Sequence, residues 1–143
     1  MRIKMMCALA ASAYAILWTQ LVQADTLNIV IQNITKQEGI LMIQVMSSEA
    51  EFNGEDGVAA TASYMQRAQG EAITISTTLP AGTYGVRIMH DVNGNQKLDT
   101  NFVGMPTEPF AFSNNAMGSF GPPKWKDVAF TLENETTQTI TLN

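Results

Sequence analysis

The feature that most constrains this chain is an alternation of apolar and polar residues with a period of two. Residues 27–32 and 40–46 each carry a branched aliphatic side chain at every second position. Because successive side chains of a strand point to opposite faces, this period is typical of half-buried β-strands. A Gln-Glu-Gly turn at 37–39 separates the two runs, so residues 28–46 are predicted to form a β-hairpin.

The same period continues further along the chain. Residues 72–79 are rich in β-branched side chains, a Pro-Ala-Gly turn follows them, and residues 83–90 alternate again. Residues 128–133 and 137–142 are predicted to form a last strand pair. With six or seven short strands and no long amphipathic helix, the pattern predicts an all-β protein, and a β-sandwich is the leading architecture.

Two segments between these strands are less regular. Residues 47–57 are acidic and are predicted to form a loop. Residues 58–69 are ambiguous: their alanines suit a helix, whereas Gly70 and the strand that follows favour a short irregular strand. The strand is the preferred interpretation.

The first residues have the pattern of a secretory signal peptide. Arg2 and Lys4 form a basic region, residues 5–22 form an apolar one, and Val-Gln-Ala at 22–24 resembles an A-x-A cleavage site. The sequence therefore predicts a signal peptide over residues 1–24, cleavage after Ala24, and one domain over residues 25–143. It also predicts a periplasmic or secreted protein without membrane insertion after cleavage.

Composition narrows the function. The full sequence of 143 residues has 45% hydrophobic residues and a formal charge of −5, as expected of one globular domain. Removal of Arg2 and Lys4 would leave six basic residues against 13 acidic ones, which disfavours nucleic acid as a partner. The only cysteine, Cys7, would be removed too, so thiol chemistry is excluded from the predicted mature chain. The methionines after Ala24 look scattered and are interpreted as core filler rather than as Cu(I) ligands.

One long stretch, residues 91–124, interrupts the strand pattern with glycines, prolines and asparagines. Structureless loops of this length are uncommon in compact domains and are usually functional or disordered. Aromatic side chains seek burial, so this segment is predicted to be an ordered loop folded across one end or edge of the sandwich. The aromatic residues in or beside it are Phe102, Phe110, Phe112, Phe120 and Trp125.

The start of that stretch resembles a cation-binding loop. Asp91, Asn93, Asn95 and Asp99 occupy positions 1, 3, 5 and 9 of a possible Ca²⁺ loop. The match is partial, because Gln96 replaces the glycine of position 6 and position 12 is Phe102 instead of glutamate. A Ca²⁺ site, which would be weak unless Glu108 or Asp127 also reaches in, is one interpretation. A metal-free loop of Asx-turns is the other, and it is slightly preferred.

His90 is the only histidine in the sequence. Together with Asp91, Asp99 and Glu108, or with Ser113 as a nucleophile, it could serve a hydrolase. No G-x-S-x-G motif is present, and adjacent strand residues point to opposite faces, so Asp91 would not orient His90. His90 is therefore predicted to anchor a loop.

A set of ordered motifs resembles one bacterial secreted family, catalogued as domain of unknown function 2141. They are Leu-Pro-Ala-Gly-Thr-Tyr at 79–84, the run from His90 to Phe102, Gly-Met-Pro-Thr-Glu at 104–108, Phe-Ser-Asn-Asn-Ala at 112–116 and Phe-Gly-Pro-Pro at 120–123. The first motif also resembles the strand entry of prealbumin-like and collagen-adhesin B-type sandwiches. The resemblance implies a single prealbumin-like (Ig-like) β-sandwich of about seven antiparallel strands with one long ordered loop. It implies no reaction, because the family has no established activity.

Two positions depart from the family pattern. Gln96 stands where a second glycine is common, and Phe110-Ala111-Phe112 stands where an aromatic-glycine-phenylalanine run is usual. The first departure weakens the tight turn and the cation interpretation.

The expected function is a non-catalytic binding module that presents the long loop to a protein, peptide or glycan partner. A structural accessory subunit of an envelope assembly is the second interpretation, and a hydrolase is the least favoured. The candidate ligand or loop residues are His90, Phe102, Glu108, Phe112, Ser113, Asn114, Asn115, Phe120 and Trp125.

Overall fold

The computed structural model describes residues 23–143. The predicted signal peptide therefore lies almost entirely outside the described residues, and only its last two positions fall inside them. Within residues 23–143 the elements, in order, are β1 (Ala24–Gln32), β2 (Ile40–Met46), α1 (Glu49–Asn53), β3 (Ala62–Arg67), β4 (Ala72–Pro80), β5 (Gly82–Asp91), β6 (Phe110–Phe112), the 3-10 turn η1 (Ser113–Asn115), α2 (Trp125–Val128), β7 (Phe130–Leu132) and β8 (Glu135–Thr141).

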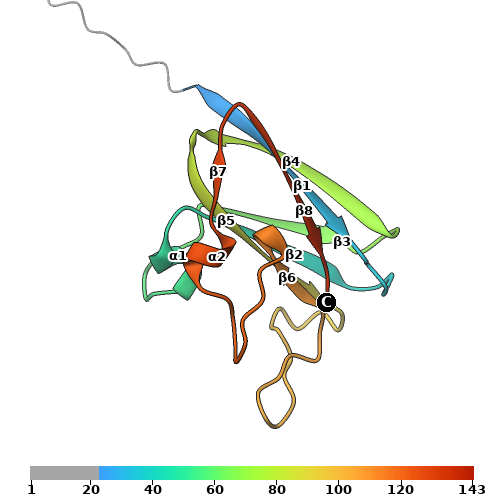
Figure 1. Cartoon of the computed structure of the whole chain (residues 1–143). Coiled ribbons are helices and arrows are strands. Elements are labelled where there is room, and N and C mark those ends of the chain that lie inside the picture. Colours follow the sequence, from blue (N-terminus) through green and yellow to red (C-terminus); the bar gives the residue numbers. More distant parts are fainter. Residues whose placement is uncertain (1–22) are drawn as a thin grey trace, which may run out of the picture.

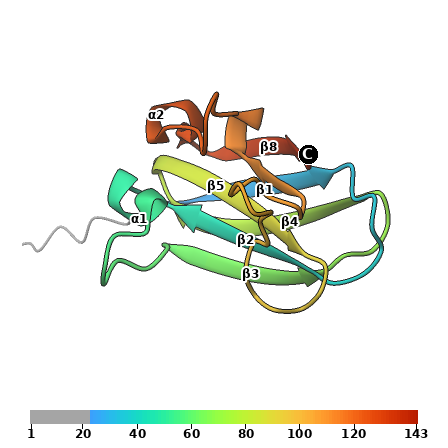
Figure 2. The ribbon, with the colours of Figure 1, turned by 90° about the horizontal axis from the view of Figure 1, so that it is seen from below.

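The strands form two sheets that pack face to face (Figure 1 and Figure 2). One sheet has the order β4-β1-β8, and the other has the order β3-β2-β5-β6, with β7 also paired to β5. The prediction of an all-β sandwich is confirmed. So is the preference for a strand within residues 58–69, where β3 lies.

The predicted hairpin over residues 28–46 and the predicted pairing of the last two strands are both wrong. β1 and β2 belong to different sheets, and so do β7 and β8. The alternating pattern assigns a face to each residue but does not identify the neighbouring strand, so two consecutive strands look the same whether they pair or change sheets. The connection between β1 and β2 ends at Gly39, which has φ +77° and lies so close to β5 that a Cβ there would meet the Asp91 carbonyl oxygen at 2.1 Å.

One strand pair also differs from the expected antiparallel arrangement. β8 runs parallel to β1 over the whole register from Thr26 opposite Glu135 to Gln32 opposite Thr141. Residue periodicity is the same in parallel and antiparallel strands, so the sequence pattern carries no signal for this direction. The first and last strands of the fold are neighbours as a result.

The main core lies between the sheets and is made of the side chains that the alternation assigned to the inner faces. Its fully buried members include Leu27, Ile29, Ile31, Leu41, Ile43, Val45, Val86, Ile88, Leu132 and Ile140. The predicted inner faces of β1, β2 and β5 are confirmed.

A second, smaller apolar cluster lies on the outer face of the five-stranded sheet. Its buried residues are Met46, Phe52, Phe112 and Val128, and Trp125 packs against them. Phe52 belongs to α1, which lies inside the acidic segment 47–57 that was expected to be loop, so that expectation is wrong. The helix forms because Ser48 caps its first turn by accepting a hydrogen bond from the Glu51 N–H at 3.3 Å, and Gly54 ends it in the left-handed conformation.

Three methionines that look scattered in the sequence are cross-strand neighbours on this outer face. Met42 of β2 is in register with Met65 of β3 on one side and Met89 of β5 on the other. The interpretation of these three as core filler is wrong, because they face away from the space between the sheets, and Met65 is 62% exposed.

Candidate functional site

The long segment 91–124 is an ordered part of the fold and contains β6 and η1. Figure 1 shows its first half, in yellow to orange, projecting from the sandwich beyond β6. Of its aromatic residues, Phe112 is buried and stacks edge-on against Phe52 with ring centroids 5.9 Å apart. The expectation that all of them seek burial is wrong for Phe102 and Phe120, which are both fully exposed.

Phe102 is exposed because it sits in a tight turn held by polar groups. The Gly104 N–H donates to the Asn101 carbonyl oxygen at 2.9 Å, and the Asn101 side chain accepts from the Val103 and Met105 N–H groups, each at 3.0 Å. The side chain of Asn101 thus satisfies the backbone that the turn leaves open. A hydrogen-bonded turn keeps its shape without burying its central side chains.

The predicted cation loop is held by hydrogen bonds of its own. The buried Asp91 carboxylate accepts backbone N–H groups from Gly94 at 2.8 Å, Asn95 at 3.1 Å and Gln96 at 2.8 Å. The Asp99 carboxylate accepts the side-chain amides of Asn93 and Asn95. These contacts agree with the alternative of Asx-turn chemistry, and Ca²⁺ at this loop stays a prediction.

Glu108 closes the other side of the same loop. Its carboxylate accepts the Val92 N–H at 2.8 Å and the Asp99 N–H at 3.1 Å, and the side chain is buried. Within residues 23–143 there is no cluster of three or more His, Cys, Asp or Glu side chains that could hold a metal ion. Through its two backbone hydrogen bonds, Glu108 fastens the loop to the end of β5.

His90 is fully buried, and its Nε2 lies 2.7 Å from the Glu38 carbonyl oxygen. A carbonyl oxygen can only accept, so Nε2 carries the proton and donates it to the connection between β1 and β2. Its Nδ1 has no partner among the described residues. His90 thus anchors a loop, and neither Asp91 nor Glu108 hydrogen-bonds its ring, so this geometry does not support a hydrolytic dyad.

The polar side chains of η1 link β5 of one sheet and the α2 region to β8 of the other sheet. Ser113 Oγ accepts the Val86 N–H at 2.9 Å and donates to the Val128 carbonyl oxygen. Asn114 Nδ2 donates to two carbonyl oxygens around α2. Asn115 binds the outer edge of β8, where its Nδ2 donates to the Thr139 oxygen at 3.1 Å and its Oδ1 accepts the Thr141 N–H at 2.8 Å. These three residues brace the fold, and a ligand role for them stays a prediction.

A pocket of about 450 Å³ opens on the outer face of the five-stranded sheet, next to the second apolar cluster. It lies between α1, β5 and the chain that leads into α2. This volume is within the usual range for small-molecule sites. We call it the outer-face pocket, and its lining residues are Glu49, Phe52, Asn53, Arg87, Met89, Leu98, Phe112, Pro122, Pro123, Lys124 and Trp125.

Arg87 is the partly buried cation of this pocket. Its Nε and Nη2 donate to the Gln44 side-chain oxygen at 3.0 and 2.6 Å, and its Nη1 donates to the Phe52 carbonyl oxygen at 3.3 Å. Burial lowers the pKa of its guanidinium from the usual value, because desolvation disfavours the charged form. Among residues 23–143, no carboxylate oxygen lies within 4.0 Å of the Arg87 guanidinium, so Arg87 forms no ion pair there.

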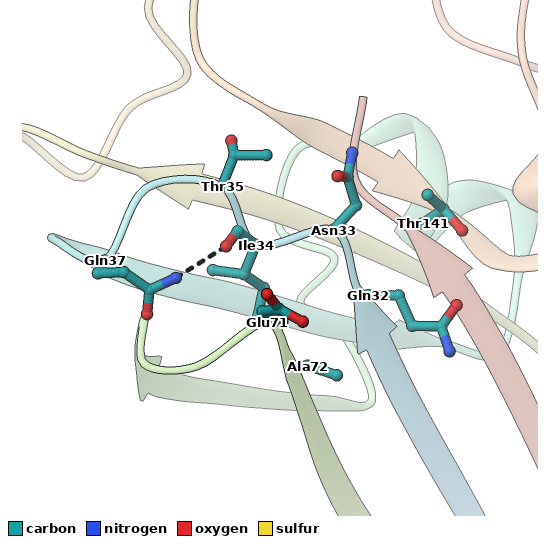
Figure 3. A pocket seen from close by; sticks show the side chains of 8 residues that line it. All are labelled: Gln32, Asn33, Ile34, Thr35, Gln37, Glu71, Ala72 and Thr141. Carbon is teal, nitrogen blue, oxygen red and sulfur yellow. Dashed lines mark hydrogen bonds between the residues drawn. The ribbon is translucent and has the colours of Figure 1, made fainter.

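A second hollow, of about 720 Å³, lies at one end of the three-stranded sheet (Figure 3). Its polar side chains already serve the fold: Asn33 Nδ2 donates to the Leu142 oxygen at 2.7 Å, and Gln37 Nε2 donates to the Ile34 oxygen at 2.8 Å. No aromatic side chain lines it. The outer-face pocket is therefore the better candidate, although it is the smaller hollow.

The candidate residues predicted from the sequence lie in three kinds of position in the structure. Phe112 and Trp125 line the outer-face pocket, Phe102 and Phe120 lie at exposed turns, and the rest brace loops or sheets. The sequence reasoning missed Arg87 and Phe52. Arg87 had a signal, because it is a charged residue between two core residues, Val86 and Ile88, and the alternation therefore places it on the outward side of β5.

No helix within residues 23–143 has the length and apolar character needed to cross a membrane. Neither the curated proteins nor the solved structures contain a match to this chain, so the prealbumin-like resemblance stays a prediction. A family model described as an uncharacterised protein conserved in bacteria, DUF2141, matches residues 29–140. This match spans every strand of both sheets at least in part, and it includes the whole outer-face pocket. The chain therefore belongs to the bacterial family DUF2141.

Proposed function

We propose that this protein is a non-catalytic binding module, exported to the periplasm or the cell exterior, and that its ligand site is the outer-face pocket. The observation that carries the proposal is a concave site with apolar walls and one half-buried, unpaired cation. Sites of this kind, mostly apolar with a few polar groups, are typical of small-ligand recognition.

The long segment has a clear part in this proposal. Leu98, Pro122, Pro123 and Lys124 all come from it, and they meet the fixed side chains of α1 and β5. Phe52 packs against Trp125 with ring centroids 6.0 Å apart, so the two walls support each other. In many binding proteins the binding residues lie on loops that a rigid scaffold of sheets holds in position.

Export is tested by expressing the full-length sequence in a bacterial host and fractionating the cells. We expect the protein outside the cytoplasm with Asp25 as its first residue, as read by mass spectrometry. A protein that keeps residues 1–24 in the cytoplasm would contradict this part.

Ligand binding is tested on the purified protein by NMR, with indole as a neutral probe. We expect indole to shift the backbone amides of Met89, Phe112 and Trp125 while the amides of β4 stay in place. Phe102→Ser, outside the pocket, is the matched control and should leave these shifts unchanged. Shifts spread evenly over the surface would contradict the pocket.

One observation favours a second function, that of a structural accessory subunit. Phe102 and Phe120 are fully exposed, which suits docking on a larger assembly. Size-exclusion of a native extract should then show the chain in a larger complex, and Phe102→Ser should release it as a monomer. A monomer in the native extract would remove this alternative.

A further inference from the structure

Arg87 occupies a defined place in the floor of the outer-face pocket. It lies in register between Gln44 of β2 and Phe112 of β6, so the three side chains form one row across the sheet. Gln44 holds two nitrogens of the guanidinium, and the backbone of α1 holds the third. The guanidinium is therefore fixed by groups on both sides before any ligand arrives.

The hydrogen bonds of Arg87 leave part of the guanidinium free. A guanidinium has five N–H donors. Three are used by Gln44 and the Phe52 carbonyl oxygen, and none of these partners carries a charge. One N–H remains on each terminal nitrogen, so two donors stay available for the two oxygens of a carboxylate.

The electrostatic situation of Arg87 also favours an anion. A half-buried cation loses hydration, and neutral acceptors compensate for this loss less well than an opposite charge does. Lys124 adds a second positive charge to the lining, against the single negative charge of Glu49. The pocket thus carries a positive balance on a protein whose formal charge is −5.

The rest of the pocket specifies what the anion is attached to. The walls combine aromatic rings, prolines, Met89 and Leu98, and they offer few hydrogen-bonding side chains apart from Asn53. A bare inorganic anion would leave these walls in contact with water. Apolar walls around one oriented cation fit a molecule with an apolar body and a single anionic end.

We propose that the outer-face pocket binds a small organic carboxylate with an aromatic or aliphatic body, and that Arg87 receives its carboxylate in a two-pronged hydrogen bond. This proposal rests on the proposed binding function of the same pocket and adds the chemical class of its ligand. The apolar body lies against Phe112 and Trp125, and Lys124 stands near the entrance as a secondary attraction.

The experiment compares acids with their amides, which have nearly the same shape but no charge. The probes are indole-3-acetate against indole-3-acetamide, and octanoate against octanamide, each titrated into the purified protein and followed by NMR. We expect the acid of at least one pair to bind about tenfold or more tightly than its amide, the factor that one charge-assisted hydrogen-bond pair supplies. Two body shapes are used so that a poor fit of one body does not decide the result.

Variants then assign the difference to Arg87. Arg87→Met, which keeps the side chain's length, should weaken acid binding about tenfold and leave amide binding unchanged, while Arg87→Lys should retain part of the preference. Arg67→Gln at the exposed edge of β3 is the matched control and should change neither. Circular dichroism and thermal melting check that each variant is folded. If Arg87→Met does not fold, Arg87→Lys still tests the role of Arg87.

The outcomes separate this inference from the proposed function. If acids and amides bind equally at the pocket, the binding function stands and the carboxylate inference is overturned. If the acid preference is unchanged in Arg87→Lys and Arg87→Met, another group supplies it and the role of Arg87 is overturned. If no probe perturbs Met89, Phe112 or Trp125, both proposals fail.

Discussion

Gly85 lies directly beneath the indole of Trp125: a Cβ at position 85 would be 2.7 Å from Cζ3 of that ring and 3.2 Å from Cγ2 of Val128. Because Gly85 has no side chain, α2 can lie flat on the sheet at this point of β5. Since Trp125 is a wall of the outer-face pocket, the shape of the pocket depends on this glycine.

Gly85→Ala should move α2 away from the sheet. The added methyl group collides with a rigid ring, and overpacking of this kind costs about 1–3 kcal/mol of unfolding free energy. We expect a lower melting temperature and a red-shifted tryptophan emission. Gly82→Ala in the same strand is the control, because its Cβ would meet only the Tyr84 ring at 3.4 Å. Equal effects of both substitutions would contradict this role of Gly85.

Asn115→Ala should destabilise the edge of β8. The substitution removes the two hydrogen bonds to Thr139 and Thr141, and it places alanine at φ +50°, where asparagine is tolerated better. We expect a loss of about 1–2 kcal/mol, measured by urea denaturation. Asn115→Asp keeps the acceptor for Thr141 and should lose less. Thr137→Ala, on the exposed face of β8, should be close to neutral.

Asp91→Ala should loosen residues 91–99 whether or not Ca²⁺ is present. The carboxylate accepts three backbone N–H groups, and hydrogen bonds to a charged group contribute about 1.5–3 kcal/mol each, without full additivity. We expect a drop in melting temperature of the same size in EDTA and in millimolar CaCl₂. If Ca²⁺ instead raises the melting temperature of the native protein, and Asp99→Ala abolishes that rise, the cation interpretation is correct.

Glu51 should make the fold sensitive to strong acid. Desolvation raises the pKa of its carboxyl, but hydrogen bonds from Ser47 and Thr61 outweigh this effect and lower the pKa from 4.5 to about 2. A depressed folded-state pKa means that the stabilisation is fully present above pH 4.5 and is lost as the pH falls towards 2. Because the group is largely solvated, we expect a contribution of only about 1 kcal/mol.

The test for Glu51 is a comparison across pH. The difference in unfolding free energy between the native protein and Glu51→Gln should be constant above pH 4.5 and shrink towards pH 2. Ser47→Ala removes the hydroxyl that donates to the Glu51 carboxylate but keeps the Ser47 N–H donor. It should therefore reduce the same difference in unfolding free energy without abolishing it. A difference that does not change with pH would show that the Glu51 carboxylate is not held in this way.

The sequence predicted the faces of the strands better than their partners. The alternation placed Leu27, Ile43 and Ile88 correctly in the core, because burial follows the period of the side chains. It could not show that β1 and β2 change sheets at Gly39, because strand pairing is decided by contacts far apart in the chain.

The candidate site shows the same limit in another form. Trp125 and Phe112 were recognisable as aromatic residues near the long segment. Their partner Phe52 comes from a short helix more than fifty positions away, and Arg87 joins them only after β5 takes its place in the sheet. A pocket assembled from distant segments has no local motif.

The parallel contact between β1 and β8 sets the order in which the molecule can be completed. Among the strands of residues 23–143, β1 is synthesised first, yet one of its two neighbours, β8, is synthesised last. Until Glu135–Thr141 is available, β1 has an unsatisfied row of backbone groups along its length. Closure of the sandwich is thus a late, long-range event, and a ribosome-bound nascent chain stalled before residue 135 should remain sensitive to protease.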